Sequence, residues 1–570
     1  MTRAWKIKEN GHIDDIRKLA EALAVSPVIA TLLVQRGITT FEKARDFFRP
    51  DLAMLHDPFL MNDMEPAVSR LEEAMKKKEK ILIYGDYDVD GTTSVAMVYS
   101  FLKKFHSELD YYIPDRYAEG YGVSFKGIDY AINRGITLII TLDCGIKSME
   151  KVAYAKEHRI DVIICDHHTP GEMLPEAVAV LNPERHDSTY PFNALSGCGV
   201  GFKLLQAYAM RNNIPFEVVS GYLDLVAVSI ASDIVPLVDE NRILAYHGLK
   251  KLNESPAVGL KAIISVAGLA DKNITIDDIV FKIGPRINAA GRIESGKQAV
   301  ELLVSEKTEE AALHCEKIDT HNQTRRNIDK TITEEALQEI AKADKYKYST
   351  VLYNPAWHKG VVGIVASRLI ENYYRPTIVL TESNGYATGS ARSIPGFDLY
   401  QAITACADLL ESFGGHMYAA GITLRKDNVQ KLRDRFEEVV RNSIGPDMLI
   451  PQIEIDAELN FKDISPKLFR ILKQFEPYGP ENMNPVFFAE SVSDNGYARL
   501  VGSDEEHLQL GLIQEDLPFT VYRAIAFNQA SHLRKIKKGS AFDIAYTLVE
   551  NNFRGNTSIQ LNVKDIKIEH

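Results

Sequence analysis

The sequence has few cysteines, no long apolar run and no excess of positive charge, and each absence argues against a class of protein. Its five cysteines are scattered over 570 residues without a C-x-x-C pair. That argues against a disulfide framework or a cysteine zinc site and fits a reducing cytoplasm. No run approaches the roughly 18 apolar residues of a membrane span, and residues 1–6 lack the apolar core of a signal peptide. We therefore expect a cytoplasmic protein that does not associate with membranes.

The charge balance does not decide whether the protein binds nucleic acid. The formal net charge of −12 does not favour nucleic acid. It does not exclude it either, because binding depends on local patches and bound metal can neutralise an acidic site. Hydrophobic residues make up 45% and charged residues 25% of the chain, as in an ordinary globular protein. A chain of 570 residues should hold about three or four domains.

An acidic segment after an apolar run is the main chemical feature of the sequence. Residues 81–84 are of strand type, and Asp86, Asp88 and Asp90 follow at alternate positions before Gly91 allows a turn into a helix. If the extended backbone continues, the three carboxylates share one side of the strand and raise one another's pKa. Magnesium or manganese would relieve this crowding. The alternative is a calcium-binding or solvated loop, although the Glu of a calcium loop is absent.

Further acidic and imidazole side chains follow other apolar runs. Strand-type runs alternate with helical segments, which predicts a doubly wound α/β domain. The runs of parallel-strand type are 81–84, 109–113, 137–142 and 160–165. Asp143, His167 and His168 follow two of these runs, and Asp233 follows a later apolar stretch. One such residue is commonly a helix cap or structural. Several at one end of a sheet indicate a ligand site, here suited to two Mn²⁺ or Mg²⁺ ions acting on a phosphate.

Together these motifs resemble the DHH phosphoesterase superfamily in order and spacing. The matching stretches are DYDVDG at 86–91, the strand end at Asp143, DHH at 166–168 and SIASDIVPL at 229–237. GPRINAAGR at 284–292 is similar to the RecJ branch, which comprises bacterial single-strand-specific 5′-exonucleases. The resemblance covers nearly the whole chain.

The resemblance implies two divalent metal ions, Mn²⁺ or Mg²⁺. The implied ligands are Asp86, Asp88, Asp90, Asp143, His167 and Asp233. By the resemblance, Asp143 occupies the position of the carboxylate that bridges the two ions. Asp86 would lie beside the first ion, either as a direct ligand or in contact with a ligand. His168 would face the scissile phosphate, so that His168, Asp143 and Asp86 are the expected catalytic residues. The alternative for His168 is a structural hydrogen bond to the next loop.

The second half of the chain carries candidate anion sites. Glycines before a helix near residue 360 let backbone amides approach an anion, and GSARS at 389–393 combines two hydroxyls with a guanidinium. The GG pair at 414–415 alone is usually only a turn. The resemblance implies a substrate-binding domain in which the GSxRS-type loop holds the terminal phosphate and the GGH turn faces the metals. The expected substrate-binding residues are Arg116, Arg286, Asn288, His358, Ser390, Arg392, Ser393, Gly415 and His416.

The remaining segments complete the expected α/β architecture. The expected segments are a helical lead-in at 1–54, a doubly wound catalytic domain at 55–304, a connecting helix at 305–346, a smaller α/β domain at 347–450 and a β-barrel at 451–570. The connecting helix has only a thin apolar stripe and is therefore expected to be exposed. The alternative is a coiled-coil seam, but the stretch lacks a clean heptad. The resemblance implies an OB-fold for the barrel, whose aromatic and basic residues suit single-stranded nucleic acid. The alternative is that the aromatic residues belong to the barrel core and the lysines to a solvated turn. For any single one of these residues, that alternative is favoured.

We predict a two-metal 5′→3′ exonuclease, specific for single-stranded DNA, that releases mononucleotides in DNA repair and recombination. The alternative is a small-substrate DHH phosphodiesterase of the oligoribonuclease or cyclic-dinucleotide type, for which a terminal barrel would be superfluous. A non-catalytic strand-binding scaffold is disfavoured because every acidic and histidine position is present. The expected partners are single-stranded DNA, a single-strand binding protein and a RecQ-type helicase, and the expected state is a monomer.

Overall fold

The computed structural model describes residues 3–342, 346–553 and 556–568 and divides into two compact units. The small unit comprises Met1–Met54, Pro236–Val238 and Gln452–His570, and the large unit comprises Leu55–Val235 and Asp239–Pro451. Residues 343–345, at the end of the predicted connecting helix, lie outside the described residues. No helix in the described part of the chain is long and apolar enough to cross a membrane.

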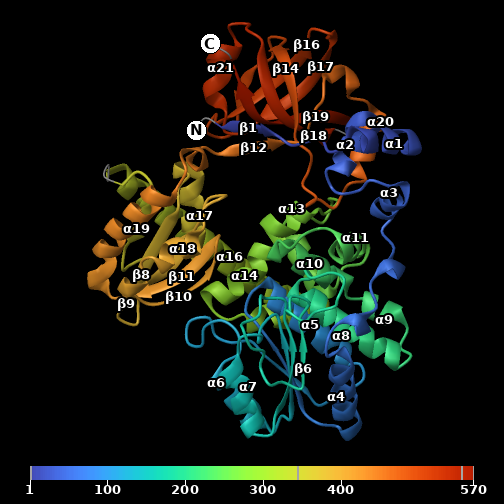
Figure 1. Cartoon of the computed structure of the whole chain (residues 1–570), viewed down its shortest axis with the longest axis vertical. Coiled ribbons are helices and arrows are strands. Elements are labelled where there is room, and N and C mark those ends of the chain that lie inside the picture. The colour runs from blue at the N-terminus through green and yellow to red at the C-terminus, as the bar shows by residue number, and fades with distance from the viewer. Residues whose placement is uncertain (1–2, 343–345, 554–555, 569–570) are drawn as a thin grey trace. The chain divides into compact units, whose positions relative to one another are not determined.

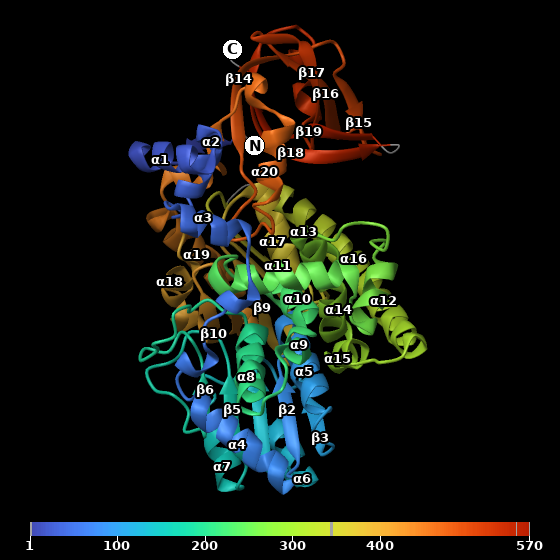
Figure 2. The ribbon, with the colours of Figure 1, turned by 90° about the vertical axis from the view of Figure 1, so that its right-hand side faces the viewer.

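The first part of the large unit is built on a parallel five-stranded sheet of order β3-β2-β4-β5-β6. The strands are β2 (Ile81–Gly85), β3 (Leu109–Tyr112), β4 (Leu138–Leu142), β5 (Asp161–Cys165) and β6 (Ala179–Leu181). They lie side by side in Figure 2. Strands β2, β4 and β6 are buried along their whole length, as continuous apolar runs in a sheet covered on both sides should be.

Helices cover both faces of this sheet, which confirms the doubly wound α/β prediction (Figure 1). The helices are α4 (Met64–Lys77), α5 (Val89–Leu102) and α8 (Gly197–Arg211) on one face, and α6 (Phe125–Arg134) and α7 (Met149–Glu157) on the other. Alternate strand residues divide between the faces. Leu82, Ile139 and Ile164 belong to the core that includes Ile128 of α6 and Val152 of α7.

A helical layer follows the parallel sheet. Its main members are α10 (Leu223–Asp233), α11 (Asp239–Glu254), α12 (Val258–Val266), a π-helical segment (Ile279–Ile283), α14 (Gly284–Ile293), α15 (Lys297–Leu303) and α16 (Thr308–Lys342). The long connecting helix is confirmed, but its predicted exposure is wrong along one side. Ala311, Cys315 and Ala336 are buried, whereas the larger Leu313 is 65% exposed. Small residues allow this close packing, and a search for large apolar residues does not detect them.

The second sheet of the large unit has the order β10-β11-β9-β8-β7. The strands are β7 (Thr350–Tyr353), β8 (Thr377–Ser383), β9 (Tyr386–Arg392), β10 (Leu410–His416) and β11 (Ala419–Leu424). One face packs on α16 and α17 (Val362–Tyr373). The other packs on α18 (Leu399–Thr404) and α19 (Val429–Ser443). The GSARS stretch, predicted as a loop, is therefore mostly strand β9.

The small unit contains a closed barrel, which confirms the predicted OB-type architecture. Its strands are β14 (Phe487–Asp494), β16 (His507–Gln514), β17 (Leu517–Ala526), β18 (Phe542–Phe553) and β19 (Asn556–Lys567). Pairing in the order β14-β18-β19-β17-β16 closes through a β14–β16 contact. The basic residues Arg534 and Lys535 lie in a short helix, α21 (Leu533–Ile536).

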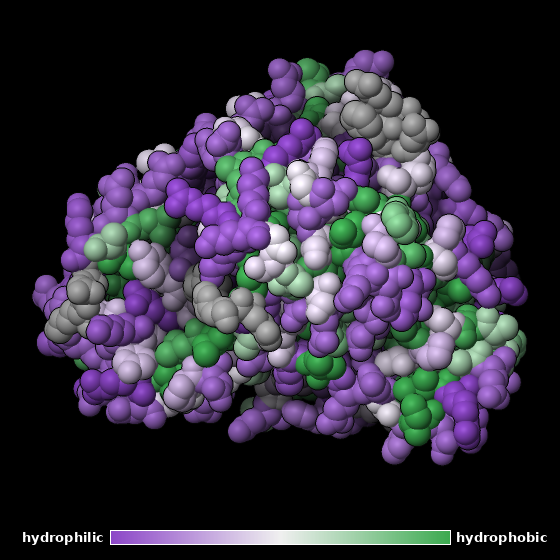
Figure 3. Space-filling model, turned by 90° about the horizontal axis from the view of Figure 1, so that it is seen from above, coloured by the Kyte–Doolittle hydropathy of each residue, from purple (hydrophilic) through white to green (hydrophobic). Residues whose placement is uncertain are grey.

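The amino-terminal helices are part of the small unit. The helices are α1 (Ile13–Leu23), α2 (Pro27–Val34) and α3 (Phe41–Phe48). Ile16 and Leu19 of α1 share one hydrophobic core with Phe487 and Leu510 of the barrel. Strand β1 (Ala4–Ile7) also pairs in parallel with β12 (Gln452–Ile455). The face of the protein in Figure 3 is mainly hydrophilic, with small hydrophobic patches between polar side chains.

Candidate metal centre and phosphate site

The acidic segment is shaped by a loop and a helix rather than by a continuing strand. Strand β2 ends at Gly85, and Asp88 caps α5 by accepting a hydrogen bond from the Gly91 N–H at 3.0 Å. The prediction that strand alternation aligns the three aspartates is therefore wrong. A Cβ on Gly91 would lie 2.4 Å from the Asp86 carbonyl oxygen, so glycine allows the first turn of α5 to pack against the loop.

Asp90 is held in place by neutral hydrogen-bond donors. Its Oδ2 accepts from the Gly197 N–H at 2.7 Å, and its Oδ1 accepts from the Cys198 N–H at 2.8 Å and the Ser229 hydroxyl at 2.7 Å. Gly197 and Cys198 begin α8, where the helix dipole favours a negative charge. These three uncharged donors fix the carboxylate.

Asp166 organises the histidine pair and was not among the predicted site residues. Its Oδ1 accepts hydrogen bonds from the backbone N–H groups of His167 and His168 at 2.8 and 3.1 Å, and lies 2.8 Å from His168 Nδ1. Its Oδ2 accepts from the Ile146 N–H at 2.9 Å. The sequence signal was available, because Asp166 is the first acidic residue after β5.

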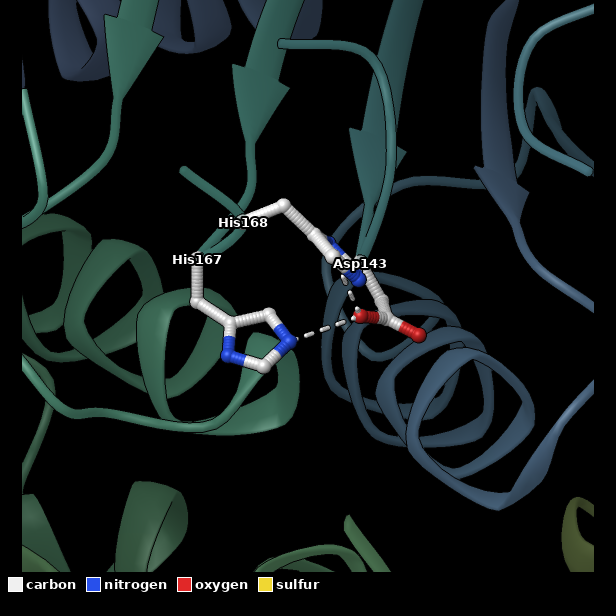
Figure 4. A group of neighbouring side chains, drawn as sticks. All are labelled: Asp143, His167 and His168. Atoms are coloured by element: carbon white, nitrogen blue, oxygen red, sulfur yellow. Dashed lines mark ion pairs between the residues drawn. The ribbon is translucent and has the colours of Figure 1, made fainter. Parts of the chain in front are cut away.

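His167 lies at the centre of the carboxylate group. Its Nε2 is 3.2 Å from Asp143 Oδ1, 3.5 Å from Asp233 Oδ2 and 3.7 Å from Asp90 Oδ2. Figure 4 shows both histidine rings directed at Asp143. Two overlapping groups, Asp143–His167–His168 and Asp90–His167–Asp233, have potential ligand atoms within 4.8 Å of one another. The structure thus brings together ligands predicted from four separate stretches of sequence.

The charges of this group fit a divalent cation. Burial and neighbouring carboxylates raise the pKa of each of four aspartates: Asp86, Asp88, Asp143 and Asp233. Among the described residues, neither the buried Asp86 Oδ2 nor His167 Nε2 has a hydrogen-bond partner. Crowded carboxylates and an imidazole nitrogen that makes no hydrogen bond match the mixed oxygen and nitrogen donors that Mn²⁺ and Mg²⁺ sites use.

His168 is held as a cation beside the carboxylates. Burial lowers its pKa, but the hydrogen bond and charge of Asp166, with the charges of Asp233 and Asp88, outweigh burial and raise it to about 9. The Tyr121 hydroxyl lies 3.2 and 3.1 Å from the two ring nitrogens and donates to the Asp143 carbonyl oxygen at 3.0 Å. The His168 side chain is still 43% exposed, so its structural hydrogen bond leaves room for contact with a substrate.

A second site in the same unit has the opposite charge. Ser390 and Arg392 lie two residues apart on β9, and Arg392 Nη1 donates to the Ser390 hydroxyl at 2.6 Å. A Cβ on Gly363, in the first turn of α17, would lie 3.0 Å from Arg392 Nη2. The guanidinium therefore lies beside a helix amino terminus, which also attracts anions. Ser393 is directed elsewhere, because its hydroxyl donates to the Phe397 carbonyl oxygen at 2.7 Å.

Arg292 joins this site, although it was not among the predicted residues. Its Nη1 donates to the Gly360 carbonyl oxygen at 3.0 Å. Burial and the positive charges of Arg116, Arg325 and Arg392 lower its pKa to about 9. The sequence signal was the last position of GPRINAAGR. We call Arg116, Arg292, Ser390 and Arg392 the arginine cluster.

Other predicted substrate-binding residues have more varied surroundings. Arg286 forms an ion pair with Asp319 at 2.9 Å, and Asn288 is half-buried on α14. His358 Nδ1 accepts from the Gly360 N–H at 3.1 Å. Burial and then the charges of Arg392 and His168 lower the pKa of His416. A Cβ on Gly415 would lie 2.3 Å from the Ala419 carbonyl oxygen, so only glycine fits there.

Comparison with known proteins gives consistent matches along the chain. The models described as "DHH family, N-terminal domain", "DHHA1 domain" and "RecJ OB domain" match residues 80–230, 343–442 and 455–565. A relative from Bacillus subtilis, the single-stranded-DNA-specific exonuclease RecJ, is 37% identical over 99% of this chain and 71% of its own length. Crystal structures of Thermus thermophilus RecJ with Mn²⁺ and with Mg²⁺ match at TM-scores of 0.85 and 0.80, with 27% and 26% identity. They cover 100% of this chain and 80% and 79% of their own chains.

Proposed function

The chain belongs to the RecJ family of single-stranded-DNA-specific exonucleases, and from this premise we propose that it hydrolyses single-stranded DNA in the 5′→3′ direction. The reaction releases mononucleotides and serves DNA repair and recombination. The observation that carries the proposal is the presence, in one unit, of a buried carboxylate group suited to metal and an arginine cluster suited to phosphate.

Asp88, Asp90, Asp143, His167 and Asp233 would hold two Mn²⁺ or Mg²⁺ ions, with Asp86 beside them. The fit rests on the raised carboxylate pKa values and on the buried Asp86 and His167 atoms that make no hydrogen bond among the described residues. When bound, two such ions supply an activated water and charge stabilisation for the phosphate under attack. Of the chain's own residues, Asp166 keeps His168 oriented and protonated, so that the imidazolium can donate a proton or hydrogen bond to the reacting phosphate.

The arginine cluster would bind the terminal phosphate and so set the polarity of digestion. Burial, and to a lesser degree neighbouring positive charges, lower the pKa values of Arg292 and Arg392. The negative charge of a phosphate dianion would raise these pKa values again. Arg392 and Ser390 are already linked, so little reorganisation is needed on binding. Residues 55–304, 305–346 and 347–450 are proposed as the catalytic domain, the connecting helix and the substrate-binding domain.

The barrel at 451–570 is proposed to hold the strand beyond the reacting end. Phe519 on β17 is 98% exposed, and an exposed aromatic ring on a barrel offers a stacking surface for a base. We propose a monomer that acts in the cytoplasm. Single-strand binding protein and a RecQ-type helicase are the partners that its substrate suggests, because they cover and generate single strands.

The polarity is tested with one single strand labelled at its 5′ end or at its 3′ end. A 5′→3′ exonuclease releases the 5′ label as a mononucleotide at the start of digestion, while the 3′ label stays in fragments that shorten with time. Asp143→Asn serves as the inactive control. Immediate release of the 3′ label, or equal rates on duplex and single strands, would contradict the proposal.

A further inference from the structure

The chain leaves the large unit immediately after the candidate ligand Asp233. Asp233 is the last residue of α10, and Val235 is the last residue of that part of the large unit. Pro236–Val238 belong to the small unit, and the large unit resumes at Asp239. A segment of three residues from the small unit is thus inserted in the chain two residues after a proposed metal ligand.

The link between Asp233 and this segment is strained. Ile234 has φ 59° and ψ 33°, the left-handed region, where a β-branched residue is an outlier. Such conformations cost of the order of 1–3 kcal/mol and persist only where the surrounding structure fixes them. The Ile234 side chain is 62% exposed, so its own packing does not account for the conformation.

Leu237 anchors the inserted segment within the small unit. Its side chain is 1% exposed, and its N–H donates to the Pro480 carbonyl oxygen at 2.8 Å. A Cβ on Gly479 would lie 2.5 Å from Leu237 Cδ1, so the two residues are in close contact. Asn482, also 1% exposed, holds this loop through donation to the Phe475 and Pro477 carbonyl oxygens at 2.8 Å each.

The returning end of the segment is equally fixed. Asp239 begins α11 with φ 46°, again left-handed, and its Oδ1 lies 2.9 Å from His56 Nε2. The next residue, Glu240, forms a fully buried ion pair with Lys203 at 2.9 Å. Two non-glycine residues in left-handed conformations therefore bracket the inserted segment.

We infer that Ile234 and Leu237 are positioning residues for Asp233. The left-handed conformation of Ile234 restricts the backbone directly after Asp233. Leu237, buried three residues further on, restricts the segment that follows. The inference rests on the proposed role of Asp233 as a metal ligand.

Ile234→Gly tests the restraint without removing any ligand. Glycine adopts the left-handed conformation freely, so the midpoint of thermal unfolding should not fall. The link becomes flexible, however, and Mn²⁺ affinity measured by isothermal titration calorimetry should weaken by about tenfold, as for loss of an outer partner of a metal ligand. Arg159→Gly is the matched control, since Arg159 is exposed, has φ 58° and follows α7. Unchanged Mn²⁺ affinity in Ile234→Gly, or an equal loss in Arg159→Gly, would overturn the inference.

Leu237 provides the second arm of the experiment. Leu237→Ala removes the buried anchor and should also weaken Mn²⁺ binding, whereas Leu237→Met conserves apolar volume and should restore it. If Leu237→Ala does not fold, the Ile234→Gly comparison decides alone. Failure of the proposed function would give a different result. Wild type and Asp143→Asn would then not differ in Mn²⁺ binding. If that difference is present and both positioning variants retain Mn²⁺ binding in full, only the present inference fails.

Discussion

The metal centre and the arginine cluster carry opposite charges but are built in the same way. Asp90 is fixed by two backbone N–H groups and the Ser229 hydroxyl. Arg292 and Arg392 are fixed by the carbonyl oxygens of Gly360 and Ala391. In both regions neutral dipoles orient groups of like charge. Apart from the pair of His168 with Asp166 at the metal centre, the countercharge is left for a ligand to supply. The main difference is the charge of the ligand: the carboxylates need a cation and the arginine cluster needs an anion.

The like charges buried in both regions affect the stability of the protein. Burying like charges together destabilises the folded protein until a ligand arrives, and a ligand that binds only the folded state stabilises it in proportion to its affinity. Mn²⁺ and inorganic phosphate should therefore both raise the unfolding midpoint, but through different residues. The following variants separate the two regions.

The largest effect is expected at the carboxylate that His167 approaches most closely. Asp143→Asn should lower exonuclease activity by more than about 1,000-fold, well beyond the roughly 10–100-fold cost of losing an outer partner of a metal ligand. Asn tolerates the left-handed backbone that Asp143 adopts at φ 59°, and loss of a charge relieves crowding, so the metal-free fold should be retained. Near-wild-type turnover of Asp143→Asn in saturating Mn²⁺ would refute the metal assignment.

A smaller effect is expected in the arginine cluster. Arg392→Ala removes charge-assisted hydrogen bonds worth about 1.5–3 kcal/mol, so the preference for 5′-phosphorylated over 5′-hydroxyl strands should shrink by about 10- to 100-fold. Mn²⁺ stabilisation should remain while phosphate stabilisation disappears. Ser393→Ala is the control, because Ser393 binds the Phe397 carbonyl oxygen instead of Arg392. An unchanged phosphate preference in Arg392→Ala would move the phosphate site elsewhere.

The pH dependence of stability should distinguish the two states of the metal centre. The pKa of His168 is raised to about 9 in the folded metal-free protein from an ordinary value near 6.5. Its stabilising contribution is therefore full below about pH 6.5 and is lost as pH rises to about 9. The raised pKa values of Asp143 and Asp233 act in the same direction, because protonation of these carboxyls favours the folded state.

We therefore expect the metal-free protein to unfold at a lower temperature at pH 9 than at pH 6.5, and Mg²⁺ to remove most of that difference. Thermal unfolding in EDTA and in Mg²⁺ across this range measures it. Asp166→Asn removes the charge that holds the His168 proton and should flatten the metal-free profile. A metal-free protein that becomes more stable with rising pH would contradict this account.

The two regions also differ in how far the sequence predicts them. The candidate metal centre can be located from the sequence because its candidate ligands follow apolar runs at the ends of parallel strands, as at Asp143 and His167. Sequence alternation nevertheless gave the wrong local geometry for Asp88, since helix capping competes with strand extension and prevails. The arginine cluster is less predictable, because Arg292 and Arg392 are separated by 100 positions and only tertiary packing brings them together. The shared core of Ile16 and Phe487 has the same origin, since no local pattern links a helix to a strand so distant in sequence.

The smallest expected effect lies outside both charged regions, at Phe519 of the barrel. Truncation at Pro451 would be a poor test of strand binding, because it would expose the core that α1 and α2 share with the barrel. Phe519→Ala avoids this, since the ring is 98% exposed and contributes little to folding.

If Phe519 stacks on a base, the affinity of Phe519→Ala for a long single strand should be lower by about 1 kcal/mol, or roughly fivefold. Hydrolysis of a dinucleotide should be unaffected, because a dinucleotide needs only the metal centre and the arginine cluster. Phe41→Ala on α3 is the matched control, an aromatic residue 49% exposed in the same unit. The decisive measurement is the ratio of long-strand to dinucleotide activity at subsaturating substrate. A ratio that is equal in wild type and Phe519→Ala would mean that this part of the barrel does not hold the strand.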